Sequence, residues 1–152
     1  MSPAPLPDEF PSAGWLEGLA SHAAEAPEVY QALGFANFRL AIEVVDPSGM
    51  PRRFGLVLDG YDVVSAGEIQ DLSAFAPEAL VTGALDAWRE MLDNIAENGG
   101  ADRAHTLNAL TLADVPLRVT SDDPMGRDKF FRYAETLQTL FDATGRRQNV
   151  AA

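Results

Sequence analysis

Two histidines and several aspartate pairs are the residues of this chain whose chemistry could serve proton transfer or metal binding. His22 and His105 stand far apart in the sequence, and the chain has no cysteine. Neither histidine has neighbours at the spacing of a metal site or of a nucleophile with its base. His105 shares a predicted short helix with Leu107, which favours a satisfied histidine at the rim of the core, and the Asp122-Asp123 pair suits a helix N-cap. We therefore expect no catalytic residue, no metal and no cofactor.

The carboxylates leave one enzymatic alternative open. Asp59 and Asp62 flank a predicted hairpin, and a desolvated carboxylate can shuttle a proton in small isomerases and cyclases. In that alternative one of the two, with Tyr30 or His105, would act on a polycyclic substrate. Turn chemistry explains Asp59 without catalysis, so the non-enzymatic hypothesis is preferred.

Large apolar side chains are concentrated on the predicted helices of the second half of the chain. Such a stripe most often packs as core, but these helices carry more large apolar groups than two small helix faces need. The excess indicates a cavity between helices and sheet that holds an apolar ligand. Alternatively, the stripe forms the interface of a dimer or of a partner-binding module. The residues expected to line the cavity are Trp88, Leu92, Leu107, Leu110, Phe130, Phe131 and Leu137.

Composition limits the partners and the location. The chain has 152 residues, with 23 acidic and 11 basic side chains and a formal net charge of -12. This charge repels the phosphate backbone of nucleic acids, so we expect no nucleic-acid partner. No apolar run reaches the roughly 18 residues of a membrane span, so no stable membrane insertion is expected. Without cysteines or a secretory signal, the cytoplasm is the expected location.

The chain divides into three predicted parts. Residues 1–11 contain four prolines and indicate a flexible arm. Residues 12–143 have the length of one domain, and residues 144–152 form a polar tail. Within the domain, Ser12 suits the N-cap of a first helix, and Pro27 opens a second short helix.

The central residues alternate in a way that is typical of β-strands. From Phe35 to Val44 the large apolar side chains fall on one face, and the more polar ones fall on the other. Asp59-Gly60 predicts a tight hairpin between the next two strands. These three strands are expected to form an antiparallel meander, followed by a loop or irregular edge strand over residues 67–76.

A strand and an amphipathic helix meet at Gly83. Residues 80–82 predict a short buried strand, and residues 85–95 then place apolar side chains three and four apart. A short helix over residues 102–110, a strand over residues 116–120 and a closing helix follow. This order predicts an α+β fold, with helices on one face of a mainly antiparallel sheet.

The run LVTGALDAWREML resembles the strand-to-helix signature of the SCP-2 (sterol carrier protein 2) like family. The segments FRLAIEVVD, RFGLVLDG, YDVVSA and PLRVTSD are similar to the family in their order, and the resemblance covers residues 35–142. The chain departs from the family pattern at two places. Glu78-Ala79 stands where an Asp usually opens the fourth strand, and Ser121-Asp122 stands where a Gly usually follows the fifth.

The resemblance implies a five-stranded sheet covered by helices, with an apolar tunnel for fatty acyl, sterol-like or other lipophilic molecules and no covalent chemistry. Our leading hypothesis is therefore a protein that binds or carries a lipophilic small molecule, and the sequence leaves a homodimer open. Ligand release would require the segment 102–112 or the last helix to move. Gly99-Gly100 and Gly126 are the expected hinges.

Overall fold

The computed structural model describes the backbone of residues 10–151 and the side chains of residues 10–143. Its five-stranded sheet has the spatial order β3-β2-β1-β4-β5. The strands are β1 (Ala36–Val45), β2 (Pro51–Gly60), β3 (Asp62–Glu68), β4 (Ala79–Ala84) and β5 (Leu117–Thr120). The alternation predicted for the first strand is confirmed, because its large apolar side chains are buried on one face: Phe38, Leu40, Ile42 and Val44.

The sheet is mixed rather than mainly antiparallel, which corrects the sequence-based expectation. Three neighbouring pairs are antiparallel, whereas β1 and β4 run parallel in the middle of the sheet. A parallel neighbour needs a crossover connection. The chain makes it from the edge strand β3 through the short helix α4 (Leu72–Phe75) to a place beside β1. Side-chain alternation reports which face of a strand is buried but not which strand it joins, so the pattern could not reveal this pair.

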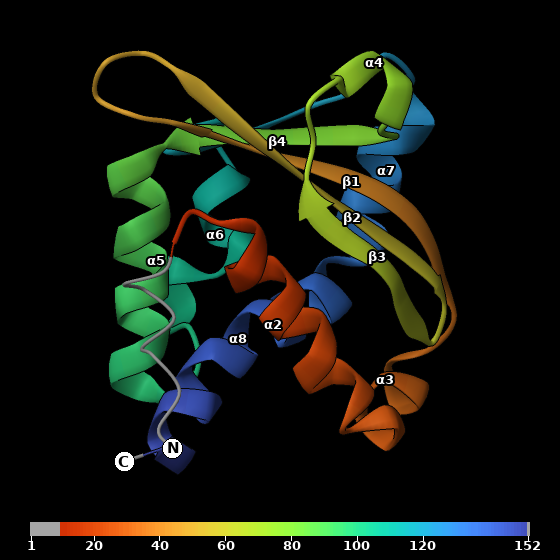
Figure 1. The fold of residues 1–152 in the computed structure, drawn as a ribbon, viewed down its shortest axis with the longest axis vertical. Helices are drawn as coiled ribbons and strands as arrows, with labels where there is room; N and C mark the ends of the chain where they lie inside the picture. Colours follow the sequence, from red (N-terminus) through yellow and green to blue (C-terminus); the bar gives the residue numbers. More distant parts are fainter. Residues whose placement is uncertain (1–9, 152) are drawn as a thin grey trace.

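Helices cover one face of the sheet, and α4 lies over the other. Figure 1 shows α2, α5, α6 and α8 together below the sheet in that view, with α4 above it. The Phe75 ring of α4 packs on Gly55, where a Cβ would lie 2.6 Å from the ring. Because successive positions of a strand point to opposite faces of the sheet, residue 55 belongs to the face opposite that of the buried Phe54. The helices besides α4 are α2 (Ala13–Ala24), α3 (Pro27–Leu33), α5 (Leu85–Asn98), the 3-10 turn η1 (Arg103–His105), α6 (Leu107–Thr111), α7 (Pro124–Arg132) and α8 (Ala134–Ala151).

Local signals begin and end several helices where the sequence predicts. At the start of α2 the backbone N–H of Trp15 donates to Ser12 Oγ at 3.0 Å. Pro27 is the first residue of α3, and Gly34 follows its last residue with a φ of 105°. Gly99 ends α5 in the left-handed conformation with a φ of 74°, which a glycine adopts at little cost.

Two predicted helices are each divided in the structure. The helix expected over residues 102–110 is split into η1 and α6, because Thr106 Oγ1 accepts from the Ala109 N–H and so caps a new helix. The closing helix is split at Tyr133 into α7 and α8. The apolar stripe nevertheless continues across the break, and its members are all buried: Phe130, Ala134, Leu137 and Phe141.

The predicted arm and tail fall partly outside the described residues. Residues 1–9 and 152 lie outside them. Phe10, the last large side chain of the predicted arm, is only 2% exposed and belongs to the core. The backbone of α8 continues as helix to Ala151. The division into arm, domain and tail stays a prediction.

Glu78 docks the closing helices to the sheet. Its backbone N–H donates to the Arg39 carbonyl at 2.8 Å, and its Oε1 accepts from the Arg39 N–H at 2.9 Å. Ser121 Oγ donates to the Glu78 carbonyl at 2.6 Å, and Lys129 Nζ lies 2.6 Å from Glu78 Oε2. Gly126 of α7 packs directly on the same carbonyl, since a Cβ there would lie 1.8 Å from the Glu78 oxygen. The two departures from the family pattern, at Glu78 and Ser121, are therefore bonded to each other.

The substitution Gly126→Ala tests this docking. A methyl group at residue 126 would overlap a backbone oxygen, so α7 must shift, and we expect the free energy of unfolding to fall by roughly 1–3 kcal/mol. Gly14→Ala is the matched control, because its nearest neighbour would be Ser12 Oγ at 3.8 Å, an ordinary contact. This control should be neutral or stabilising. Urea denaturation followed by tryptophan fluorescence measures both variants, and equal stabilities would contradict the proposed docking.

Candidate functional site

Four aromatic rings meet in the core between the sheet and the helices. The Trp88 indole donates to the Glu43 carbonyl of β1 at 3.2 Å, which fixes the ring against the sheet. The Trp88 ring centroid lies 6.4 Å from that of Phe10 and 6.5 Å from that of Phe141. Trp15 of α2 lies 4.7 Å from Phe10 and 5.6 Å from Phe141. We refer to Phe10, Trp15, Trp88 and Phe141 as the aromatic cluster.

Six of the seven residues predicted to line a cavity lie in one contiguous apolar core. Phe131 is the exception, with 38% of its surface exposed. Its ring stands perpendicular to that of Phe130 at 5.1 Å, and the Arg127 guanidinium lies 5.2 Å from its centre. Leu112 and Met125, two large apolar residues that lie between Trp88 and Phe130 in the sequence, are exposed as well. The six residues in the core are Trp88, Leu92, Leu107, Leu110, Phe130 and Leu137.

The burial of Phe10 was missed by the sequence analysis. The prolines around Phe10 indicate an arm, and this composition hid the burial of its ring. Trp15 follows the Ser12 cap and so belongs to the first predicted helix, but nothing in the pattern places it next to Trp88. The available signal was a large apolar residue close to the Ser12 cap, in a segment that is otherwise poor in large apolar side chains.

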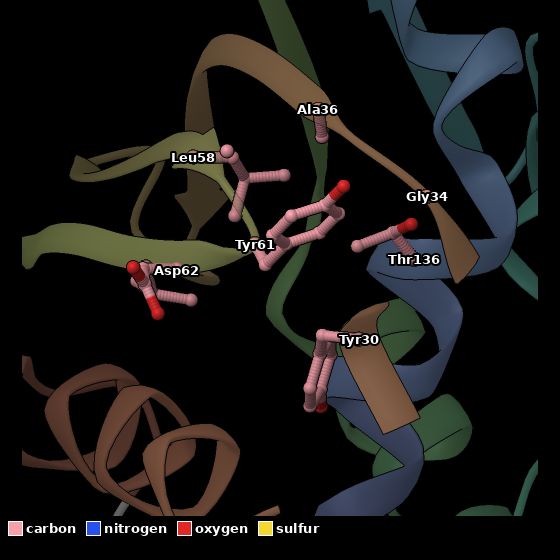
Figure 2. Close-up of a pocket in the computed structure, with 9 residues that line it drawn as sticks. Tyr30, Gly34, Ala36, Leu58, Tyr61, Asp62 and Thr136 are labelled. Atoms are coloured by element: carbon pink, nitrogen blue, oxygen red, sulfur yellow. The ribbon is translucent and has the colours of Figure 1, made fainter. Parts of the chain in front are cut away.

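A small cavity lies where α3, the β2–β3 hairpin and α8 meet. Its volume is about 10 Å³, which is room for about one water molecule. Figure 2 shows the Tyr61 ring between Leu58 and Thr136, with Asp62 and Tyr30 on two other sides. The cavity is too small for a lipophilic molecule.

The residues of the enzymatic alternative are only partly brought together. Tyr30 and Asp62 line the same small cavity, but Asp62 and Asp59 are both exposed. An exposed carboxylate lacks the desolvation that would prepare it for proton transfer. His105 lies on η1, and both of its ring nitrogens are hydrogen-bonded to Asp102 and Glu90. The geometry therefore gives Asp59 and Asp62 no buried setting for acid–base chemistry.

The interface alternative is also weakened by burial. It required the aromatic stripe to be available to a second chain. Trp88, Phe130 and Leu137 are at most 1% exposed within a single chain. A stripe buried in this way cannot contact a partner unless the fold opens.

Two surface grooves are larger, but both are lined by carboxylates. One, of about 220 Å³, lies beside the start of α7 and includes Glu78, Asp122 and Asp123. The other, of about 290 Å³, lies between α4 and the strands β2 and β3, and includes Glu68 and Asp71. Neither groove is lined by a predicted wall residue. Their carboxylates make both grooves unsuitable for an apolar ligand.

His105 bridges the segment after α5 back to that helix. His105 Nδ1 lies 2.7 Å from Asp102 Oδ1, and its Nε2 lies 3.1 Å from Glu90 Oε2. The hydrogen bond to Asp102, supported by that to Glu90, raises the pKa of His105 above its ordinary 6.5. The hydrogen bond from His105, with a second from Asn94, lowers the pKa of Asp102 below its ordinary 3.8. We call Glu90, His105 and Asp102 the His105 bridge. It makes His105 the satisfied histidine that the sequence predicts.

The segment 102–112 is bonded on both sides. Asn94 of α5 exchanges two hydrogen bonds with Asp102, one to its backbone N–H at 2.9 Å and one to its carboxylate at 2.8 Å. The Leu107 N–H donates to Gln138 Oε1 of α8 at 2.7 Å. The segment is therefore held between the two helices that flank the core.

Comparison with solved structures shows that the chain has the sterol carrier protein 2 fold. A crystal structure of sterol carrier protein 2 matches it with a TM-score of 0.67 and 13% identity, over 88% of this chain and 95% of that chain. A solution structure of a conserved hypothetical protein from Thermus thermophilus, suggested to be a sterol carrier protein, matches with a TM-score of 0.56 and 15% identity, over 83% and 82%. No family model and no curated protein matches the sequence. The resemblance inferred from the sequence is thus confirmed for the fold.

The described residues contain neither a membrane-spanning helix nor a cluster of metal ligands. No helix among them has the length and apolar character needed to cross a bilayer. These residues also contain no group of three or more histidine, aspartate or glutamate side chains that could hold a metal ion.

The His105 bridge predicts a pH dependence of stability. Because the folded-state pKa of His105 is raised, the stabilisation is complete below about pH 6.5 and is lost as the pH rises through the folded-state value. The depressed pKa of Asp102 means that the bridge also weakens when the pH falls well below 4. We expect His105→Gln to remove the alkaline part of this dependence and His22→Gln to keep it. NMR titration of the His105 imidazole and denaturation from pH 5 to pH 9 measure it, and a His105 pKa below 6.5 would contradict the bridge.

Proposed function

We propose that this protein binds and carries a lipophilic small molecule, sterol-like, fatty acyl or otherwise apolar, between its sheet and its helices. The observation that carries the proposal is a core built from aromatic and aliphatic side chains of α2, α5, α6, α7 and α8 against the apolar face of an SCP2-type sheet. The solved structures that the chain resembles are named as sterol carriers or suggested carriers. Both observations support a carrier and call for no covalent chemistry.

The predicted wall residues would form the ligand surface. The buried members, such as Trp88, Leu92 and Leu107, are apolar and belong to the core. Protein interiors are close-packed, so an entering ligand must displace side chains of the core. In that event contacts between side chains are exchanged for contacts with the ligand, which keeps most of the hydrophobic stabilisation.

Movement of the segment 102–112 would open one end of this core. Gly99-Gly100 lies one residue before the segment and gives it a hinge, since Gly99 already has the left-handed conformation. The hydrogen bonds of the His105 bridge and of Gln138 would have to break during this movement. Gly126 is explained by its packing on Glu78, so the hinge proposal rests on Gly99-Gly100.

The remaining proposals concern catalysis and partners. We propose a non-catalytic protein of the cytoplasm that has no nucleic-acid partner, in keeping with its formal charge of -12. The oligomeric state is tested by the same mass measurement as the ligand.

Native mass spectrometry of the purified protein is the first test of the carrier function. We expect a stoichiometric adduct that denaturing extraction releases as a lipophilic molecule, because a tightly held apolar ligand survives purification. The mass of the intact species also gives the number of chains. A clean mass without adduct, together with no uptake of a fluorescent fatty acid or sterol, would overturn the proposal.

Phe131→Asp tests the wall assignment. Phe131 is the one predicted wall residue whose substitution should leave the core intact, because its ring is 38% exposed. A carboxylate beside a bound lipophile is unfavourable, so we expect affinity for a fluorescent lipophile to fall about tenfold. The control is Met50→Asp, which adds the same charge at a side chain that is 65% exposed in the β1–β2 loop. If both folded variants bind equally well, Phe131 does not line the site.

A further inference from the structure

Phe10 fills a place in the aromatic cluster that no regular element of the fold supplies. Its ring is 2% exposed and stands edge-on to Trp15, at an interplanar angle of 83°. The residue precedes α2, and its backbone lies beside α5, because its carbonyl accepts from Arg89 of that helix. A single side chain from the segment before α2 thus completes a cluster otherwise built by α2, α5 and α8.

The backbone around Phe10 is held by two arginines at the surface. Arg89 Nη2 of α5 donates to the Phe10 carbonyl at 3.2 Å, and Arg52 Nη1 of β2 donates to the Pro11 carbonyl at 2.7 Å. Both arginines are exposed, so water competes for these bonds and their net contribution is modest. The segment can therefore be displaced without breaking a strand or a helix.

Trp15 provides a second and independent observation. Its indole is 0% exposed, and its Nε1–H is the buried side-chain donor that lacks an acceptor in the part of the chain described. Buried donors are nearly always hydrogen-bonded, and leaving one unsatisfied is costly. The Trp88 indole in the same cluster shows the normal case, because it donates to a backbone carbonyl. The cluster thus contains an unused donor next to a removable ring.

We infer that the place of Phe10 is a binding slot for an uncharged, oxygen-bearing lipophile, and that Phe10 is an intramolecular plug which this ligand displaces. The apolar part of the ligand would take the position of the Phe10 ring against Trp15 and Trp88, and a hydroxyl, ketone or ester oxygen would accept the hydrogen bond of Trp15 Nε1. This inference rests on the proposed carrier function and specifies the class of its ligand.

The preference for an uncharged ligand follows from the surroundings of the slot. One indole N–H between aromatic rings can satisfy a neutral oxygen, whereas a buried carboxylate needs a cationic partner or several donors. The two nearby guanidinium groups, of Arg52 and Arg89, are at the surface, and Arg52 is already paired with Glu68 at 3.0 Å. The formal charge of -12 adds a general repulsion of anions.

The test compares the full-length protein with variants, using cis-parinaric acid and its methyl ester as probes with the same tail. Binding is followed by energy transfer from the two tryptophans of the chain. We expect the ester to bind more tightly than the acid to the unchanged protein. Phe10→Ala should tighten ester binding about tenfold, because the competent state no longer has to be formed by displacing the ring. Phe75→Ala, a matched loss of a ring on the opposite face of the sheet, should leave the affinity unchanged.

Two further variants separate the plug from effects on folding. Arg89→Ala loosens the segment without removing a buried ring and should tighten ester binding about threefold, whereas Arg118→Ala removes the same charge from β5 and should have no effect. Trp15→Phe keeps an aromatic ring, although a smaller one, but removes the donor, and we expect ester binding to weaken about fivefold.

The outcomes distinguish this inference from the proposed function. If the ester binds but neither Phe10→Ala nor Arg89→Ala changes its affinity, the plug is wrong and the carrier function stands. If the acid binds as tightly as the ester, or if Trp15→Phe binds like the unchanged protein, the ligand class is wrong. If no variant binds either probe and no lipophile copurifies, the carrier function itself is contradicted, and the inference falls with it.

Discussion

The bonds of Glu78 set the geometry on which the rest of the molecule depends. The parallel pairing of β1 with β4 begins at Leu40 and Ala79, directly after the two hydrogen bonds that join Glu78 to Arg39. Glu78 also accepts a hydrogen bond from Ser121, which follows β5, and forms an ion pair with Lys129 of α7. Its carbonyl leaves no space for a side chain at residue 126. One residue therefore fixes both the register of the central strands and the approach of α7. Because α8 follows α7 after a single residue, its path across the sheet is fixed by the same contacts.

That geometry places the helices close enough to the sheet to exclude water, but it leaves part of the core to be completed by the segment before α2. In a folded core, buried hydrogen-bond donors nearly always have an acceptor. Here the Trp88 indole is satisfied by the backbone of β1, while the Trp15 indole, which contacts Phe10, has no acceptor in the described part of the chain. The difference between these two tryptophans is a physical reason to regard the Phe10 side of the core as the side that accepts another molecule.

The sequence predicts what depends on local chemistry. The Ser12 cap, the Pro27 start and the helix after Gly83 each follow from a few neighbouring residues, and the structure confirms them. The predicted hairpin between β2 and β3 also forms, but Asp59 pairs with Asp62, so its turn lies at Gly60-Tyr61 rather than at Asp59-Gly60. The resemblance also led to the right fold. The parallel β1–β4 pair and the burial of Phe10 depend on contacts between distant segments, which periodicity does not report. The same limit applies to the site: helical spacing predicts which residues share a face, but it does not tell which of the adjacent Phe130 and Phe131 packs in the core and which is exposed.

The two candidate openings of the core differ in physical character. The segment 102–112 is held by the polar, partly exposed groups of the His105 bridge and by Gln138, for which water is a ready competitor. Its movement would uncover Leu107 and Leu110, which border the core, before it reached the aromatic cluster. Displacing Phe10 gives up the burial of a large apolar ring, worth about 1.5–3 kcal/mol, but it opens the cluster directly and an apolar ligand restores that burial. Only a lipophile can replace the buried apolar surface that is lost when Phe10 moves out, so opening on this side is selective for the ligand. The hydrogen bonds that hold the segment 102–112 respond instead to solvent and pH.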